Sequence, residues 1–330
     1  MQMIKSNYQW FMALAVVLVM PLFIESGSLA SEVLIYALAV LGCNLLLGFT
    51  GLLSFGQGIF FGMGSYTLGI LLVRLDWPLA VTLPLTVLAG VLSAIFVGSL
   101  AIRQRNVYFA LLTLAMAQMF YFLAYTMTGL TGGDNGLLDV PRPALSLLGT
   151  ELMSLETPWQ FYCFVALCFL TVFWLLQRIT TSVFGRTLLA IRDNEPRASA
   201  VGYDVQRLKL AVFAISGGVT ALAGGLLAMM AGIAPLSSIE YHTSEMILVM
   251  TIIGGTSSLF ASLLGAGFYI IAADWLSFIW PRWLMLLGVL LMLISLYMQR
   301  GLWGIGETLW HLMRRRRTPP AKATPTEPQP

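Results

Sequence analysis

The chain has 330 residues, of which 58% are hydrophobic and only 10% are charged. Soluble domains carry about 25% charged residues, so this composition excludes an ordinary water-soluble globular protein and indicates that apolar surface faces lipid. The formal net charge of +3 excludes little by itself, because in a membrane protein the positions of the charges carry the information.

Apolar segments that approach the length of a membrane span recur along the whole chain. A spanning helix needs about 20 mostly apolar residues, because each residue rises only about 1.5 Å. Ten segments fit this description: Tyr8–Ile24, Val33–Phe49, Phe55–Val73, Leu79–Ile102, Tyr108–Thr128, Trp159–Gln177, Leu208–Ala231, Ser244–Ser258, Leu259–Ile279 and Trp283–Gln299. The sequence therefore predicts an all-α fold, a polytopic transmembrane helical bundle of about ten spans within residues 1–312.

The loops between these segments differ in charge. If the N-terminus lies inside, 15 of the 18 Lys and Arg residues fall in inner segments, whereas Arg74, Arg142 and Arg282 fall outside. The outer segments hold many of the acidic residues, with Glu240 and Glu245 among them. Since cytoplasmic loops collect Lys and Arg, both termini are predicted to be cytoplasmic.

Both ends of the chain leave an alternative open. Lys5, the apolar run to Ile24 and the segment Ser28–Ala30 also resemble a cleavable signal peptide, whose removal would leave nine spans. We favour an uncleaved first span, because cleavage would remove the inner anchor of the first loop. Residues 313–330 are basic and then rich in Pro and Thr, which predicts a disordered cytoplasmic tail. Its arginines are expected to anchor the last span and could contact membrane lipid headgroups.

Two regions are too rich in glycine for plain lipid-facing helices. Irregular backbone at membrane depth is tolerated only where protein or a water-filled cavity covers it. Both regions are therefore candidates for a translocation path. The alternative is that their glycines only let neighbouring helices approach closely. The candidate residues are Gly48, Gly51, Ser54, Gly56 and Gln57 in the first region, and Gly254, Gly255 and Thr256 in the second.

The sequence contains no pattern typical of a catalytic site. A phosphate loop of the form G-x-x-x-x-G-K-S/T, H-E-x-x-H and G-x-S-x-G are all missing. The protein is therefore not expected to be an enzyme, and a nucleotide that powers it would be hydrolysed by another chain. The cysteines lie in apolar runs and the two histidines lie far apart, so neither a metal nor another cofactor is expected. Asp274, inside a predicted span, fits a structural hydrogen bond better than ion coupling.

The predicted inner loop at residues 178–209 is the most informative soluble segment. It is long for a connection between helices and holds six basic and three acidic residues. Asp193 or Asn194 can cap a short helix, Pro196 suits its first turn and Gly202 can end it. On spacing alone, a docking element for a cytoplasmic partner and an ordinary loop helix are equally good interpretations.

At this point the chain resembles a known family, the LivM-type permeases of branched-chain amino-acid ABC importers. The resemblance runs from about Val33 to Tyr297. Five segments carry it in order: Asn44–Gly58, Thr131–Leu137, the loop Gly185–Gly202, Ser216–Ala228, and Ile253–Gly255 with Leu263–Ala266. Five ordered matches across one chain are far more specific than any single match.

The resemblance implies a non-catalytic permease subunit in the bacterial inner (cytoplasmic) membrane. It implies a second homologous permease subunit, two ATPase subunits that hydrolyse ATP below, and a periplasmic substrate-binding protein above; no nucleic acid is involved. In such permeases the inner loop couples to the ATPase, which assigns that role to Arg186, Arg192, Asp193, Asn194, Glu195, Ala198 and Gly202. The spacing from Glu195 to Gly202 is one residue longer than the family pattern, and Pro196-Arg197 replaces an alanine pair. The resemblance therefore assigns the coupling role to the loop and leaves its contact residues open.

Several interpretations of substrate and energy source stay open. Urea and short-chain amide importers share the family, so the substrate is a branched-chain amino acid, a related amino acid or such an amide. An ion-coupled secondary transporter would need further buried ionisable residues, and a membrane-embedded enzyme would need polar residues clustered at one depth. The two glycine-rich regions lie in spans three and eight, which we expect to be equivalent positions of two inverted five-span halves.

Overall fold

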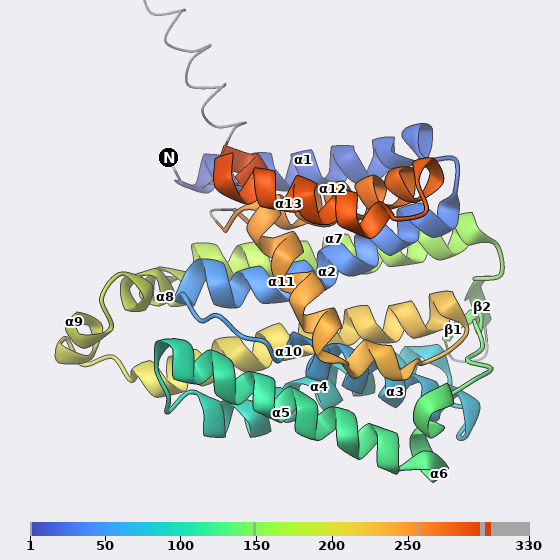
Figure 1. Ribbon diagram of the computed structural model, residues 1–330, viewed down its shortest axis with the longest axis horizontal. Helices are drawn as coiled ribbons and strands as arrows, with labels where there is room; N and C mark the ends of the chain where they lie inside the picture. The colour runs from blue at the N-terminus through green and yellow to red at the C-terminus, as the bar shows by residue number, and fades with distance from the viewer. Residues whose placement is uncertain (1, 148–149, 257, 298–300, 305–330) are drawn as a thin grey trace, which may run out of the picture.

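The computed structural model describes residues 2–147, 150–256, 258–297 and 301–304, and it shows a bundle of long helices (Figure 1). Its elements are α1 (Gln2–Phe23), α2 (Gly27–Thr50), α3 (Gln57–Val73), α4 (Leu79–Ala101), α5 (Asn106–Thr126), α6 (Thr128–Thr131), η1 (Gly133–Asn135), β1 (Leu145–Leu147), β2 (Thr150–Met153), α7 (Pro158–Thr181), α8 (Val183–Asp193), α9 (Glu195–Ala200), α10 (Val205–Ala231), η2 (Leu236–Ile239), α11 (Tyr241–Gly254), α12 (Phe260–Ile279) and α13 (Trp283–Tyr297). The two strands pair antiparallel. The described part of the chain is thus almost entirely helical, as predicted, and the predicted tail at 313–330 lies outside it.

Each predicted span overlaps one of these helices, but the helices differ in length. Six of them, α2, α4, α5, α7, α10 and α12, are long and apolar enough to cross a membrane. α1, α3 and α13 contribute shorter apolar stretches, and α11 has only 14 residues. At 1.5 Å per residue α11 is about 21 Å long, less than the hydrocarbon thickness of about 30 Å. Helix length therefore supports a bundle with several spans, and by itself it supports six of the ten predicted crossings.

The two ends of the bundle differ in structure. We name them the α9 end, where α8, α9 and the start of α1 lie, and the hairpin end, where β1 and β2 lie (Figure 1). α2 runs toward the α9 end, and α10 runs from the α9 end toward the hairpin end. The short helices α8 and α9 project beyond the long helices.

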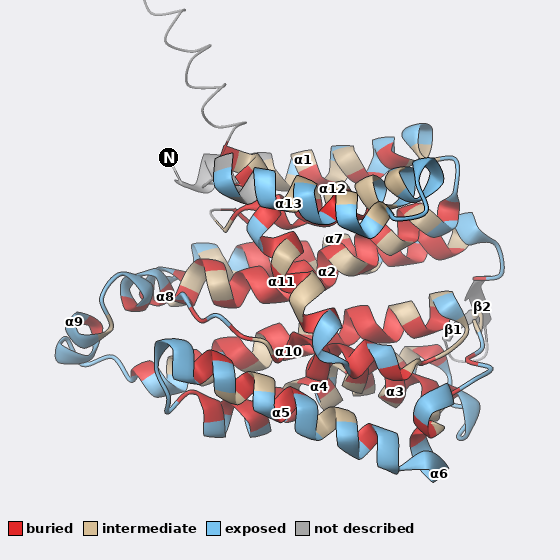
Figure 2. Ribbon diagram, viewed as in Figure 1, coloured by how far each residue is buried: buried red, intermediate tan, exposed pale blue. Residues whose placement is uncertain are grey.

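The two central helices are α2 and α10, and the buried residues are concentrated along them (Figure 2). Of the apolar stretch of each helix, 83% is buried in α2 and 72% in α10. Small residues make this packing possible. A Cβ on Gly42 would overlap Ser216 and Thr220 of α10, and a Cβ on Gly90 of α4 would overlap Gly217. Because lipid offers no hydrophobic drive between helices, such close backbone contact is a main source of their association.

α3 and α11 both start inside the bundle rather than at one of its ends. The side chain of Gln57, the first residue of α3, is hydrogen-bonded to Ser216 and Thr220 of α10, at 3.3 and 2.8 Å. Ser216 lies about 17 Å along α10 from Val205, which is near the middle of that helix. The start of α11 is beside it, since Ser244 accepts a 2.7 Å hydrogen bond from the backbone N–H of Gly58.

The expected equivalence of the two glycine-rich regions is wrong. The first region runs from the end of α2 to the start of α3, whereas the second follows the end of α11, and the two meet at the α9 end, where Gly48 packs against the carbonyl of Thr256. A two-fold axis in the membrane plane would place equivalent segments at opposite ends. The segment that matches the end of α2 is instead the end of α10. Gly51 follows α2 with φ 72° and ψ 13°, and Gly232 follows α10 with φ 71° and ψ 12°.

Candidate functional site

The helices α8 and α9 form the candidate site at the α9 end. Asn194 separates them, and its side-chain oxygen accepts a 3.0 Å hydrogen bond from the backbone N–H of Arg197, as a helix N-cap does. Pro196 occupies the first turn of α9. After α9, Gly202 takes a φ of 100°, which favours glycine and turns the chain toward α10. The short capped helix predicted from the sequence is confirmed, with Asn194 as the cap and Asp193 as the last residue of α8.

An apolar underside attaches this element to the bundle. Ile191 of α8, Ala198 of α9 and Val205 of α10 form a small buried cluster, and Leu208 packs against it. The α8 residues Gly185 and Leu188 are also buried. The element is therefore held to the bundle along one face, while its opposite face is open. Arg186, Arg192, Asp193, Pro196 and Arg197 of this element are exposed.

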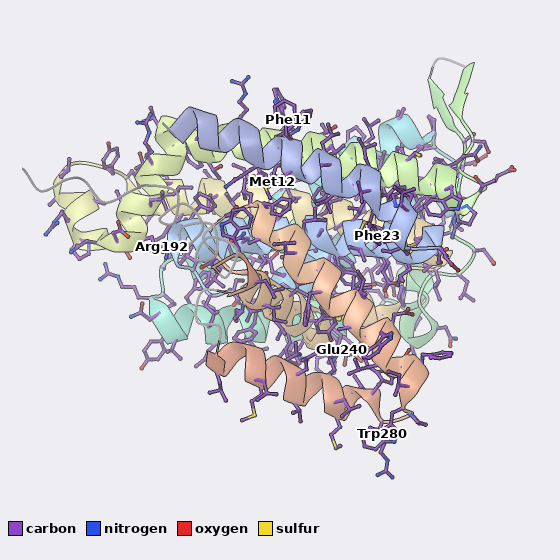
Figure 3. The ribbon with its side chains drawn as sticks, turned by 90° about the horizontal axis from the view of Figure 1, so that it is seen from above. Phe11, Met12, Phe23, Arg192, Glu240 and Trp280 are labelled. Carbon is purple, nitrogen blue, oxygen red and sulfur yellow. The ribbon has the colours of Figure 1, made fainter. Side chains whose placement is uncertain are left out.

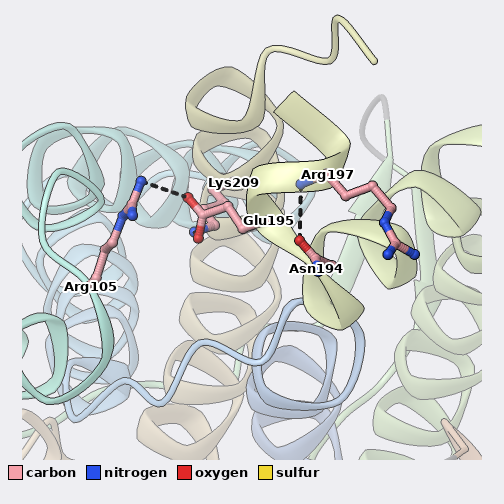
Figure 4. A network of polar contacts seen from close by, with 5 residues as sticks. All are labelled: Arg105, Asn194, Glu195, Arg197 and Lys209. Carbon is pink, nitrogen blue, oxygen red and sulfur yellow. Dashed lines mark hydrogen bonds and ion pairs between the residues drawn. The ribbon is translucent and has the colours of Figure 1, made fainter. Parts of the chain in front are cut away.

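Glu195 links α9 to two long helices (Figure 4). Its carboxylate accepts a 2.8 Å hydrogen bond from the ammonium group of Lys209 in α10, whose side chain is only 7% exposed. The guanidinium group of Arg105, just before α5, lies 4.0 Å from the other carboxylate oxygen. The Arg105 side chain is 73% exposed, so this second pair contributes little in water. The Lys209 pair is the stronger link, because its ammonium group has lost most of its contact with water.

Arg192 links α8 to the end of α2. Its guanidinium group donates a hydrogen bond to the backbone carbonyl of Gly48, in the last turn of α2. Its aliphatic stem lies beside Gly51, where an added Cβ would be 3.4 Å away. Gly48 also packs against Thr256, in the connection between α11 and α12. Two contacts, Arg192 to Gly48 and Gly48 to Thr256, therefore join α8 to that connection. Figure 3 shows Arg192 at the end of the molecule that carries α8 and α9.

Two hollows flank α9. The larger has a volume of about 720 Å³ and lies between α9, the start of α5 and the segment at residues 50–55. The smaller, of about 660 Å³, lies between α9, Arg105 and the start of α10. Both include Glu195 and Pro196 in their walls. Gly51 of the first glycine-rich region and the predicted coupling residues Arg192, Asp193, Asn194 and Glu195 thus line one hollow, which was not expected from the sequence.

Gly48 and Gly254, two of the residues predicted to line a translocation path, are closely packed in this structure, whereas Gly51 is exposed and lines the larger hollow. Asn44 donates to the carbonyl of Ser258 and the hydroxyl of Ser262, at 2.9 and 3.0 Å, and so joins α2 to the start of α12. A Cβ on Gly254 would overlap the backbone of Ala261. These contacts favour the packing interpretation for Gly48 and Gly254. A role of the predicted set in translocation stays a prediction.

The start of α3 is organised by polar contacts. Ser54 accepts a 3.1 Å hydrogen bond from the N–H of Gly56, and Thr113 of α5 accepts one of 3.1 Å from the N–H of Phe55. Gln57 is fully buried. These bonds satisfy backbone groups that an unwound segment inside a membrane would otherwise leave without partners. The sequence indicated an irregular segment here, but not which side chains would stabilise it.

The sequence assigned Glu240 and Glu245 to the outer segments, and the structure places Glu240 further inside the bundle than a surface loop would lie. A Cβ on Gly58 would lie 2.8 Å from the carbonyl oxygen of Glu240, which places the start of α11 beside the start of α3. The connection from Gly232 leads inward along α3, since Ile239 packs against Gly62. Sequence reasoning missed this because the segment contains Pro235 and polar residues, as a surface loop does. The sequence feature that could have indicated this position is the apolar run of α11, which has only 14 residues and is too short to cross the hydrocarbon.

Comparisons with known proteins give the same family as the sequence resemblance. The profile of the family described as "Branched-chain amino acid transport system / permease component" matches residues 27–296. The high-affinity branched-chain amino acid transport system permease protein LivM of Salmonella typhimurium is 28% identical over 314 residues, covering 89% of this chain and 74% of the relative. LivM of Escherichia coli is 26% identical, covering 86% and 71%. A probable LivM of Methanocaldococcus jannaschii is 24% identical, covering 81% and 90%. No solved structure matches the chain.

Proposed function

The chain belongs to the family of branched-chain amino acid transport permease components, and from this premise we propose that it is the membrane-spanning subunit of an ABC importer. It forms the path for branched-chain or related amino acids, and ATPase subunits on other chains supply the energy. The observation that carries this proposal is the projecting element α8–α9, which is fixed to α2 through Arg192 and to α10 through Glu195.

The proposed assembly contains a second homologous permease, two ATPase subunits and a periplasmic substrate-binding protein. In this arrangement the α9 end faces the cytoplasm of a bacterium and the hairpin end faces the periplasm. The positions of the basic residues support this orientation, since Arg105, Arg186, Arg192, Arg197 and Arg207 all belong to loops or helices of the α9 end.

We also propose ten membrane segments arranged as two inverted halves, α1–α5 and α7–α13. α2 and α10 pack on each other, and each is followed by a glycine with nearly the same left-handed conformation. Each then leads through an irregular connection to a short helix that starts inside the bundle, α3 or α11. α10 packs on α3 and α4, and α2 packs on α11 and α12. Short helices that start inside the membrane are typical of inverted-repeat transporters.

The contacts of α9 suggest how ATP hydrolysis drives transport. An ATPase that closes on α9 would push on a rigid element rather than on a loose loop. Glu195 passes the displacement to α10 through Lys209, and Arg192 passes it to the end of α2. α2 and α10 are the two most buried long helices, so both halves of the bundle respond to the same movement.

Reconstitution in liposomes tests this function. The complete complex with its sister permease, ATPases and binding protein should accumulate leucine only when ATP is present on the side of the ATPases. Competition with isoleucine, valine, urea and short amides then identifies the substrate class. ATP-independent uptake by this chain alone, driven by an ion gradient, would contradict the proposal.

A further inference from the structure

η2 and the first turns of α11 carry polar side chains halfway between the two ends of the bundle. We define the α11 face as Ser237, Glu240, Tyr241, His242 and Glu245. Gly58, which touches Glu240 and Ser244, directly follows Gln57, whose side chain is bonded to the middle of α10. The α11 face therefore lies near the mid-length of α10, a helix long enough to cross a membrane.

These side chains point outward and not into the core. Ser237, Glu240, Tyr241 and His242 are exposed, and Glu245 is partly exposed. Figure 3 shows Glu240 on the side of the molecule that carries α13, opposite Phe11 of α1, and Figure 2 shows the exposed start of α11 between α5 and α13. Both of those helices contact α11.

Hydrocarbon cannot be the neighbour of this face. Placing an ionisable side chain at the centre of a spanning helix costs about 2.5–3.5 kcal/mol on insertion scales, so such residues face protein or a water-filled cavity. The exposed surfaces of α5 and α13 around it, with Phe122, Leu123, Met292 and Leu293, are by contrast apolar. The apolar borders on α5 and α13 can pack against another membrane protein, while the polar strip between them faces a water-filled space in the interface.

We propose that the α11 face lines a water-filled translocation path, and that the second permease subunit closes this path by packing on α5 and α13. The inference rests on the proposed function, because it takes the second permease as the covering partner. Carboxylates, an imidazole and hydroxyls are the groups that can hydrogen-bond an amino-acid zwitterion during passage. None of the five residues of the α11 face is among the eight residues predicted from the glycine pattern.

Reactivity of introduced thiols tests the proposal in the reconstituted complex. Cys43, Cys163 and Cys168 are first replaced by Ala, and His242→Cys or Ser237→Cys is then introduced alone. Leu92→Cys is the matched control. Leu92 is exposed on α4, and it lies at a similar depth because Gly90 packs against Gly217 in the middle of α10. Glu156→Cys, in the exposed loop before α7, gives the rate for water. The probe is a charged, water-soluble methanethiosulfonate.

The α11 face should behave as a surface in water. The thiol of His242→Cys should react within about tenfold of the Glu156→Cys rate and about a hundredfold faster than that of Leu92→Cys, because only thiolates in water react readily. Ser237→Cys should react similarly, which covers the case that His242→Cys fails to assemble. Rates at both positions no faster than at Leu92→Cys would overturn the proposal. Leucine uptake by the complex without native cysteines is measured on the same vesicles. If this complex shows no ATP-dependent uptake, the result contradicts the proposed function and leaves the proposal for the α11 face to be judged by the thiol reactivities.

Discussion

At the scale of single residues, Arg192 differs from the other arginines of α8 and α9. Arg186, Arg192 and Arg197 are all exposed, but the guanidinium group of Arg192 also donates a hydrogen bond to the carbonyl of Gly48. A charged donor on a carbonyl near a helix C-terminus is stabilising, because that end of the helix is partly negative. The sequence predicted a coupling role for Arg192, but its inward contact joins residues 144 positions apart and no local pattern indicates it.

Replacing Arg192 should separate ATP hydrolysis from transport. In the reconstituted complex, Arg192→Gln should lower leucine uptake at least about tenfold, which corresponds to about 1.4 kcal/mol. ATP hydrolysis should continue, because Gln is too short to bind Gly48 but leaves α9 free to dock. Arg207→Gln is the control, since Arg207 is 88% exposed and pairs only with the neighbouring Asp204. Uptake by Arg192→Gln at the level of this control would contradict the role of Arg192.

Glycine packing is a second property of single residues. A Cβ on Gly224 of α10 would lie 2.6 Å from the carbonyl carbon of Phe61, in the backbone of α3, whereas a Cβ on Gly288 of α13 would have no neighbour within 4 Å. Gly224→Ala should therefore destabilise the purified protein by about 1–3 kcal/mol, as overpacking does. Gly288→Ala should be neutral or slightly stabilising. Thermal unfolding in detergent measures both, and equal melting temperatures for the two variants would contradict the close approach of α3 and α10.

At the scale of elements, the structure separates what a sequence pattern fixes from what it does not. The cap at Asn194, the Pro at the start of α9 and the long apolar helices follow from local rules, and all are confirmed. The starts of α3 and α11 are different. They depend on hydrogen bonds between distant segments, such as Gly58 to Ser244 and Gln57 to Thr220, and a hydropathy pattern contains no information about them.

The attachment of α9 to α10 gives a prediction at the element scale. Glu195→Gln leaves the ammonium group of Lys209 poorly exposed and without its carboxylate, so it should destabilise the α9–α10 junction by about 1–3 kcal/mol. Adding Lys209→Met removes the stranded charge and should recover more than half of this loss. Proteolysis between α9 and α10 measures the stability of the junction. A double variant as sensitive to protease as the single variant would show that the pair does not hold α9.

At the scale of the whole molecule, two of the three exceptions to the charge pattern have a structural reason. Arg74 and Arg142, two of the predicted outer arginines, are hydrogen-bonded to backbone carbonyls. Arg74 donates to the carbonyls of Gly129 and Leu130, and Arg142 donates to those of Met229 and Met230 near the end of α10. Their guanidinium groups stabilise chain turns and a helix end at the hairpin end. Apart from Arg282, in the turn between α12 and α13, the remaining basic residues of the described loops gather at the α9 end, as expected of a cytoplasmic surface.

The sidedness of α9 is the most direct test, because an element outside the cell cannot dock an ATPase. In a background without native cysteines, Ser199→Cys places a thiol on the exposed side of α9, and Glu156→Cys places one at the hairpin end. Intact cells are treated with a membrane-impermeant maleimide. We predict labelling of Glu156→Cys in intact cells, and labelling of Ser199→Cys only after the membrane is opened. Labelling of Ser199→Cys from outside, with Glu156→Cys protected, would contradict the account.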